Sequence, residues 1–140
     1  MSSASAKNGD KGERRVISLL ASKGYWATVL QRSRTGSQPF DIVAIRKDGV
    51  RGNDVLMLDA KYVEKGYRFS FDDIQPNQIE SMSFSSDITN ATIGFAIVFG
   101  EIEDRIMFFP YDDYIRMKDV AHSVNASSLE HLELFLGGNE

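Results

Sequence analysis

The spacing of apolar residues along the chain changes from helical to extended, and polar turn residues separate the segments. Val16, Leu19 and Leu20 recur at the spacing of one helix face, and Gly24 follows them as a stop signal. The pattern therefore predicts a first helix over residues 11–23.

Five later segments are rich in β-branched and aromatic residues, which is typical of strands. These predicted strands span residues 25–30, 40–46, 55–62, 92–99 and 105–109. The second and third are separated by Asp-Gly and Gly-Asn pairs, which form turns, so we expect them to make a hairpin. The fourth is apolar almost throughout, which predicts a central strand covered on both faces.

Three more helices are expected in the second half of the chain. Pro76 suits the first turn of a helix over residues 76–85, and a weaker helix is expected over 111–120. Ser127 and Glu130 have the spacing of a capping box in front of a final helix. The order of elements predicts an α/β fold (α+β mixed), with a small mixed central sheet flanked by helices.

The composition is that of one ordinary globular domain: the chain has 140 residues, 42% of them are hydrophobic, and none is cysteine. We expect a single domain over residues 10–140, preceded by a polar, disordered tail over 1–9. The lack of cysteine excludes disulfides and fits a reducing compartment. No apolar stretch approaches the ~18 residues of a membrane span, and the polar start lacks a signal-peptide core. A cytoplasmic protein with no membrane partner is therefore expected.

Charge is divided unevenly along the chain, although the formal net charge is only -4. Residues 1–70 carry thirteen Lys or Arg against seven acids, whereas residues 71–140 carry three against thirteen. This asymmetry suggests one basic face for a polyanion and one acidic face turned away from it. The alternative is simple solvation of surface helices.

The predicted hairpin carries the sharpest chemical feature, a pair of acids among apolar residues. Asp41 and Asp59 are equally far from the middle of the turn, so a symmetric hairpin makes them cross-strand neighbours on one face. Like charges opposed in a sheet are destabilising, and a hard divalent cation such as Mg²⁺ relieves them. A one-residue slip in register would separate them. The alternative is that Asp41 caps a strand end and Asp59 pairs with Lys61 or an arginine.

These residues resemble the PD-(D/E)XK nuclease superfamily, in which an acid on one strand is followed by acid-x-lysine on the next. Asp41 follows Pro39 and Phe40, and Asp59-Ala60-Lys61 supplies the second part. Within that superfamily, the chain resembles the small Holliday junction resolvases of the archaeal type and of the recombination type of Gram-positive bacteria. The resemblance rests on three further segments and covers about residues 10–110: Lys11-Gly12-Glu13-Arg14 in the opening helix, Pro76-Asn77-Gln78-Ile79-Glu80 in the later helix, and the polar loop 32–38.

The resemblance implies a restriction-endonuclease-like core and a set of roles for the matching residues. Asp41, Asp59 and the carbonyl of Ala60 would hold Mg²⁺, for which Mn²⁺ can substitute, and Glu13 would complete the site directly or through water. Lys61 would orient or deprotonate the attacking water or stabilise the pentacovalent phosphate, and Gln78 would orient the nucleophile or a phosphate oxygen. The chain departs from the family pattern in two places: one residue separates Pro39 from Asp41, and Asp59 stands where many resolvases have Glu.

Basic residues near these motifs are the expected DNA contacts. Lys11, Arg14 and Arg15 surround Glu13, and Arg32, Arg34 and Ser37 lie in the polar loop, where they supply phosphate donors. We therefore expect a metal-dependent endonuclease that cuts four-way DNA junctions as a homodimer, because two symmetric cuts need two active sites. The alternatives are a restriction or repair endonuclease acting on duplex DNA, and a catalytically silent DNA-binding module. His131 lies away from the acidic motifs and is expected to be structural.

Overall fold

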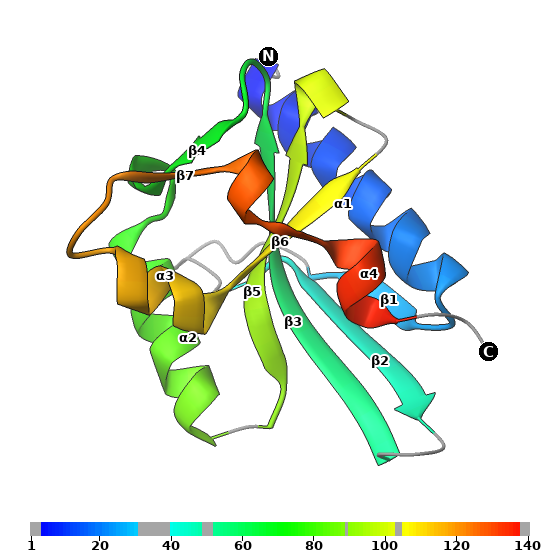
Figure 1. Ribbon diagram of the computed structural model, residues 1–140. Helices are drawn as coiled ribbons and strands as arrows, with labels where there is room; N and C mark the ends of the chain where they lie inside the picture. Colours follow the sequence, from blue (N-terminus) through cyan, green and yellow to red (C-terminus); the bar gives the residue numbers. More distant parts are fainter. Residues whose placement is uncertain (1–3, 31–39, 49–51, 89, 103–104, 138–140) are drawn as a thin grey trace.

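A central sheet of six strands organises the chain in the computed structural model, which describes residues 4–30, 40–48, 52–88, 90–102 and 105–137 (Figure 1). The strands lie side by side in the order β1 (Trp26–Val29), β2 (Ile42–Asp48), β3 (Gly52–Val63), β5 (Thr92–Phe99), β6 (Ile106–Pro110) and β8 (Glu130–His131). Among the described strands of this sheet, β3 and β5 are parallel neighbours and the other neighbouring pairs are antiparallel. The predicted small mixed sheet is therefore confirmed.

The parallel pair requires a crossover, and the chain makes it on one face of the sheet. The crossover contains β4 (Arg68–Ser70), the short helix η1 (Phe71–Asp73) and α2 (Pro76–Ile88). β4 also pairs with β7 (Ser123–Asn125) in a two-stranded sheet that the sequence pattern did not predict. Each of these strands has three residues, which is too short for a readable alternation.

Helices cover both faces of the sheet, as Figure 1 shows. One face packs against α1 (Ala4–Ser22) and α4 (Leu132–Leu136), through a core that includes Val16, Leu20 and Leu58. The other face packs against α2, α3 (Tyr111–Met117) and the small sheet, through a second core rich in phenylalanine. β5 lies between the two cores, and seven of its eight residues are buried, as its apolar sequence predicted.

The ends of the helices differ most from the sequence predictions. α1 begins at Ala4, so residues 4–9, which were expected in a disordered tail, extend the first helix. α3 ends at Met117 rather than at residue 120. Residues 1–3 lie outside the described part of the chain.

The predicted capping box at Ser127 and Glu130 is wrong. Ser127 lies in the short helix η3 (Ala126–Ser128), and Glu130 belongs to β8, where it pairs with Phe108 of β6. The open edge of β6 offers backbone hydrogen bonds that a local capping signal cannot match, so tertiary pairing overrides it. α4 is consequently a five-residue helix.

None of the described helices combines the length and the apolarity that crossing a bilayer requires.

Two glycines allow backbone segments to approach closely: Gly94 lies in β5 and Gly100 begins the short helix η2 (Gly100–Ile102). A Cβ atom at Gly94 would lie 2.7 Å from the carbonyl oxygen of Phe109 on β6. At Gly100, a Cβ atom would lie 2.5 Å from the carbonyl oxygen of Glu64.

Candidate metal and phosphodiester site

The register of the β2–β3 hairpin brings Asp41 and Asp59 together. Ile42 pairs with Leu58, and Asp41, one residue before β2, donates its backbone N–H to the Leu58 carbonyl at 2.9 Å. The carbonyl of Asp41 in turn accepts the N–H of Leu30 at 2.7 Å, so its backbone is held from both sides. The symmetric register predicted from the sequence is confirmed.

Asp59 is the one charged residue among the described residues that the fold buries, with a relative exposure of 1%. Burial disfavours its carboxylate and raises its pKa to about 7; Lys61 opposes this shift, and Asp41 adds to it by charge repulsion and a side-chain hydrogen bond. A carboxyl group with such a pKa carries charge or a proton depending on what binds beside it.

The side chain of Lys61 projects from β3 on the same face as Asp59, and three acceptors contact its ammonium group. Nζ lies 3.0 Å from Oδ2 of Asp59 as an ion pair, and it donates to the Asp73 carbonyl at 3.0 Å and to Gln78 Oε1 at 3.4 Å. The Asp73 carbonyl is a partner that sequence reasoning missed, because a backbone acceptor leaves no residue-type signal. The ammonium group is therefore fixed beside the acid pair.

Gln78 connects this site to the start of α2. Its Oε1 accepts the backbone N–H of Gln75 at 3.1 Å as well as the Lys61 contact. The first N–H groups of a helix have no partner within the helix, so this bond caps α2 while it aims Gln78 at Lys61. The sequence placed Gln78 on this helix, and the structure brings it to the acid pair.

Glu13 does not join the two aspartates as a third carboxylate. α1 packs on the face formed by Leu58 and its even-numbered neighbours, whereas Asp59 and Lys61 project from the opposite face. Within the described ranges, no three His, Asp or Glu side chains gather in a group that would hold a metal ion. The role of Glu13 at the metal, direct or through water, therefore stays a prediction.

Of the expected DNA contacts, Lys11, Arg14 and the half-buried Arg15 are described. Lys11 and Arg14 are exposed on α1, and the Lys11 ammonium lies 5.4 Å from the centre of the Tyr62 ring. Arg32, Arg34 and Ser37 lie outside the described residues.

Arg46, counted from the sequence in the basic half, is tied into the fold instead. Its guanidinium pairs with Asp54 at 3.0 Å, donates to the carbonyls of Lys23 and Leu136, and lies 4.5 Å from the ring centre of Tyr25. It fastens β2 to the ends of α1 and α4.

The donor set fits a hard divalent cation. Asp59 Oδ2 is buried and forms an ion pair with Lys61, and Oδ2 of Asp41 accepts a long bond, 3.3 Å, from the Ala60 N–H. Two adjacent carboxylates are the oxygen ligands that Mg²⁺ and Mn²⁺ favour.

This architecture, a mixed sheet with an acid-bearing hairpin and helices on both faces, matches the fold of a solved Holliday junction resolvase. The particular structure it resembles is that of Archaeoglobus fulgidus Hjc, a Holliday junction resolvase from an archaeal hyperthermophile. The TM-score is 0.63, the identity is 19%, and the match covers 92% of this chain and 100% of the other. The expected restriction-endonuclease-like core is confirmed at the level of the fold. No family model matches the chain, and no curated protein matches it in sequence.

Proposed function

We propose that this protein is a metal-dependent endonuclease that cuts four-way DNA junctions by paired phosphodiester hydrolysis. The observation that carries the proposal is the pairing of Asp41 with the buried Asp59, beside a lysine held by three acceptors. A fold that needed only stability would gain nothing from opposing two carboxylates in an apolar sheet, because like charges there are destabilising. The arrangement is useful when the two acids hold a cation at a phosphate.

Each residue of the site has a role that follows from its position. Asp41, Asp59 and the Ala60 carbonyl would bind Mg²⁺, with Mn²⁺ as a substitute and Glu13 acting directly or through water. When bound, the ion lowers the pKa of a water molecule and neutralises charge on the scissile phosphate. Lys61 donates hydrogen bonds to the attacking water or to a phosphate oxygen, and Gln78 keeps its ammonium group in place.

The proposal includes DNA junctions as substrate and a second copy of the chain as partner. The described part of the chain has one such acid pair, and a two-fold dimer would supply the second site for symmetric nicks. Lys11 and Arg14 on α1, together with Arg32, Arg34 and Ser37 in the loop, would contact the DNA backbone. Its place of action would be the cytoplasm of a prokaryotic or phage-infected cell.

The experiment is cleavage of a labelled four-way junction beside a linear duplex of matching sequence, with Mg²⁺ and with chelator. We expect paired nicks in the junction, lost with chelator and reduced at least ~10³-fold in Asp59→Asn, since a metal ligand is removed. Asp112→Asn, at an exposed position of α3, is the matched control and should cut at the wild-type rate.

Two other outcomes would contradict the junction assignment. Cutting of the duplex at least as fast as the junction would indicate a restriction or repair endonuclease of the same fold. Tight junction binding without metal-dependent cutting would indicate a silent DNA-binding module.

A further inference from the structure

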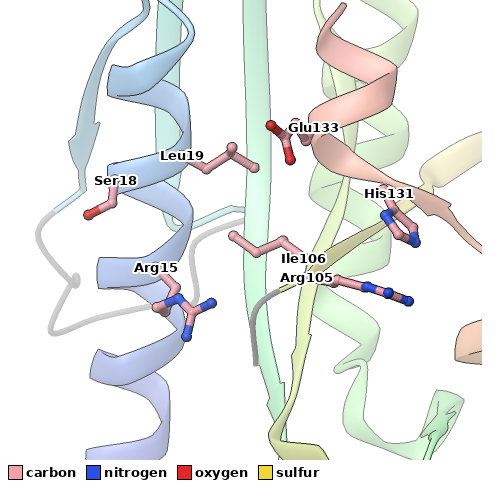
Figure 2. A pocket seen from close by; sticks show the side chains of 7 residues that line it. All are labelled: Arg15, Ser18, Leu19, Arg105, Ile106, His131 and Glu133. Carbon is pink, nitrogen blue, oxygen red and sulfur yellow. The ribbon is translucent and has the colours of Figure 1, made fainter. Parts of the chain in front are cut away.

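One face of β1 and β2 carries no packed helix, and it is the face from which the acid pair projects. On this face α3 packs over β5 and β6, and α2 belongs to the same phenylalanine-rich core. Within the described residues, neither helix packs extensively on β1 or β2. The opposite face differs, because α1 covers both strands there, and Leu19 and Ile106 point into the space between α1 and α4 (Figure 2). A binding partner can therefore approach β1 and β2 from the side of the acid pair.

Apolar side chains occupy this uncovered face. Trp26 of β1 lies opposite Ile45 of β2, which lies opposite Val55 of β3, so the three form one apolar row across the strands. Trp26 is 63% exposed, Ile45 is 42% exposed, and Val55 is half-buried. A strand face that meets water usually carries polar side chains, and a contiguous exposed apolar patch marks a binding surface.

The apolar row and the acid pair project from the same side of the sheet. Asp41 precedes Ile45 by four residues, and alternation along a strand puts both side chains on one face, about 13 Å apart at ~3.3 Å per residue. Val43 and Met57, which pair with each other, lie between the row and the acid pair. A protein pressed onto the row would therefore also crowd Asp41 and Asp59, where a phosphate has to enter. A DNA strand reaches both places, because its phosphates advance only ~3.4 Å per nucleotide.

The charge of this face also suits DNA. Besides the acid pair, the charged side chains that the described residues of β1, β2 and β3 direct to it are those of Lys47 and Lys61, both basic. Lys47 is exposed and lies two residues beyond Ile45. A polyanionic strand that passes the apolar row therefore meets positive charge beside it.

A tryptophan on this surface can distinguish branched DNA from linear DNA through stacking. An aromatic ring stacks on the flat face of any base, with little dependence on sequence. In a linear duplex, neighbouring bases cover these faces except at the ends, whereas a four-way junction interrupts the stack where its strands exchange. Phosphate contacts do not make this distinction, because both DNAs carry the same backbone.

We infer that Trp26 stacks on a base left uncovered at the centre of a four-way junction, and that this contact makes the protein prefer junctions to linear duplex. Ile45, its cross-strand neighbour, extends the apolar surface beside the ring. The inference rests on the proposed function, and it adds the residue that recognises the branch point, which the phosphate contacts do not supply.

The first test uses the fluorescence of Trp26, which is the one tryptophan in the sequence, so its emission reports on this contact alone. A four-way junction is added in chelator, so that nothing is cut. We expect a saturating junction to quench the emission about twofold or more, as the indole stacks on a base. The comparison is two equivalents of duplex, each as long as two junction arms, which offer as many helix ends as one junction. The duplex should quench far less.

The second test measures junction and duplex affinity by fluorescence anisotropy, again in chelator. Trp26→Leu keeps an apolar side chain that cannot stack, and Trp26→Phe keeps a ring. The matched control is Phe84→Leu, which removes a ring that is 65% exposed on α2. We expect Trp26→Leu to bind the junction about tenfold more weakly and the duplex unchanged. Trp26→Phe and Phe84→Leu should stay close to the wild-type affinity for both DNAs.

Three results would overturn the inference. The first is junction binding without quenching, and the second is an equal loss of junction and duplex affinity in Trp26→Leu. The third is an emission that shifts to the blue with protein concentration in the absence of DNA, together with loss of a dimer in Trp26→Leu, because a second copy then covers the row. The fluorescence test needs no variant, so it decides the question if Trp26→Leu fails to fold.

Failure of the proposed function gives a different pattern. A wild-type protein that binds neither DNA contradicts the proposed function and the inference together. Absence of cutting, with junction-selective binding and quenching intact, contradicts the nuclease alone and leaves the role of Trp26 in place.

Discussion

At the scale of single residues, Asp59 has the most unusual environment of the candidate site. It is 1% exposed, faces Asp41, and contacts Lys61, and burial with the neighbouring acid raises its pKa to about 7 from 3.8. A raised pKa means that the folded protein binds a proton more tightly than the unfolded chain does. In the absence of metal, stability therefore falls as the pH rises between about 4 and 7.

This predicts that Asp59→Asn stabilises the metal-free protein at pH 8, by on the order of a few kcal/mol, because no charge is left to bury. This gain in stability should disappear near pH 4. Lys61 keeps its contacts with Asp73 and Gln78 in the variant. Thermal denaturation of both proteins in chelator, at pH 8 and at pH 4, measures the gain.

Addition of excess Mg²⁺ is the second arm of that measurement. It should raise the Tm of the wild-type protein and leave Asp59→Asn unchanged, since a ligand stabilises only the state that binds it. A wild-type protein more stable than the variant at pH 8 in chelator would contradict the assigned pKa shift.

At the scale of elements, the close approach of two strands restricts which residue a position can hold more than strand propensity does. Gly94 lies opposite Pro110 where β5 pairs with β6. A Cβ atom at this position would lie 2.7 Å from the Phe109 carbonyl oxygen and 2.8 Å from Cε1 of Phe108. The first contact is with backbone of the neighbouring strand, which moves only if the pairing shifts.

We therefore expect Gly94→Ala to destabilise the protein by about 1–3 kcal/mol, the usual cost of overfilling a packed core. Gly12→Ala is the matched control, because the atoms nearest to a Cβ there are at ordinary contact distance, 3.5 Å or more, and alanine favours the helix. Urea denaturation should show the control to be neutral or more stable. Equal losses in both variants would contradict the packing argument.

Over the whole molecule, the division of charge along the chain does not translate simply into two faces. Arg46 and Lys61, from the basic half, are engaged inside the fold. The crossover after β3 then brings the backbone carbonyl of Asp73, rather than its carboxylate, to Lys61. The basic residues that remain accessible include Lys11 and Arg14 on α1.

If these two side chains neutralise DNA phosphates, Lys11→Gln/Arg14→Gln should weaken junction binding and flatten its dependence on salt. Each lost phosphate contact lowers the slope of log K against log salt by about 0.9. Anisotropy titrations at several salt concentrations measure the slope, with Arg116→Gln/Lys118→Gln as control. An unchanged slope would remove α1 from the DNA interface.

Much of the fold and part of the site were predictable from sequence because their signals are local. Apolar runs identified β5 to the residue, and the turn residues of the hairpin set the register that pairs Asp41 with Asp59. The prediction failed at Glu130, where an open strand edge overrode a capping signal, and β4 was too short to show a pattern.

The sequence by itself determined the order of the longer helices and strands, the position of the acid pair and the lysine beside it, because alternation along neighbouring strands fixes which side chains share a face. Only the tertiary structure decided what surrounds them. Packing buried Asp59, brought Gln78 and the Asp73 carbonyl to Lys61, and placed α1 on the opposite face of the sheet. Such contacts join distant segments, so they depend on how layers pack rather than on any local pattern.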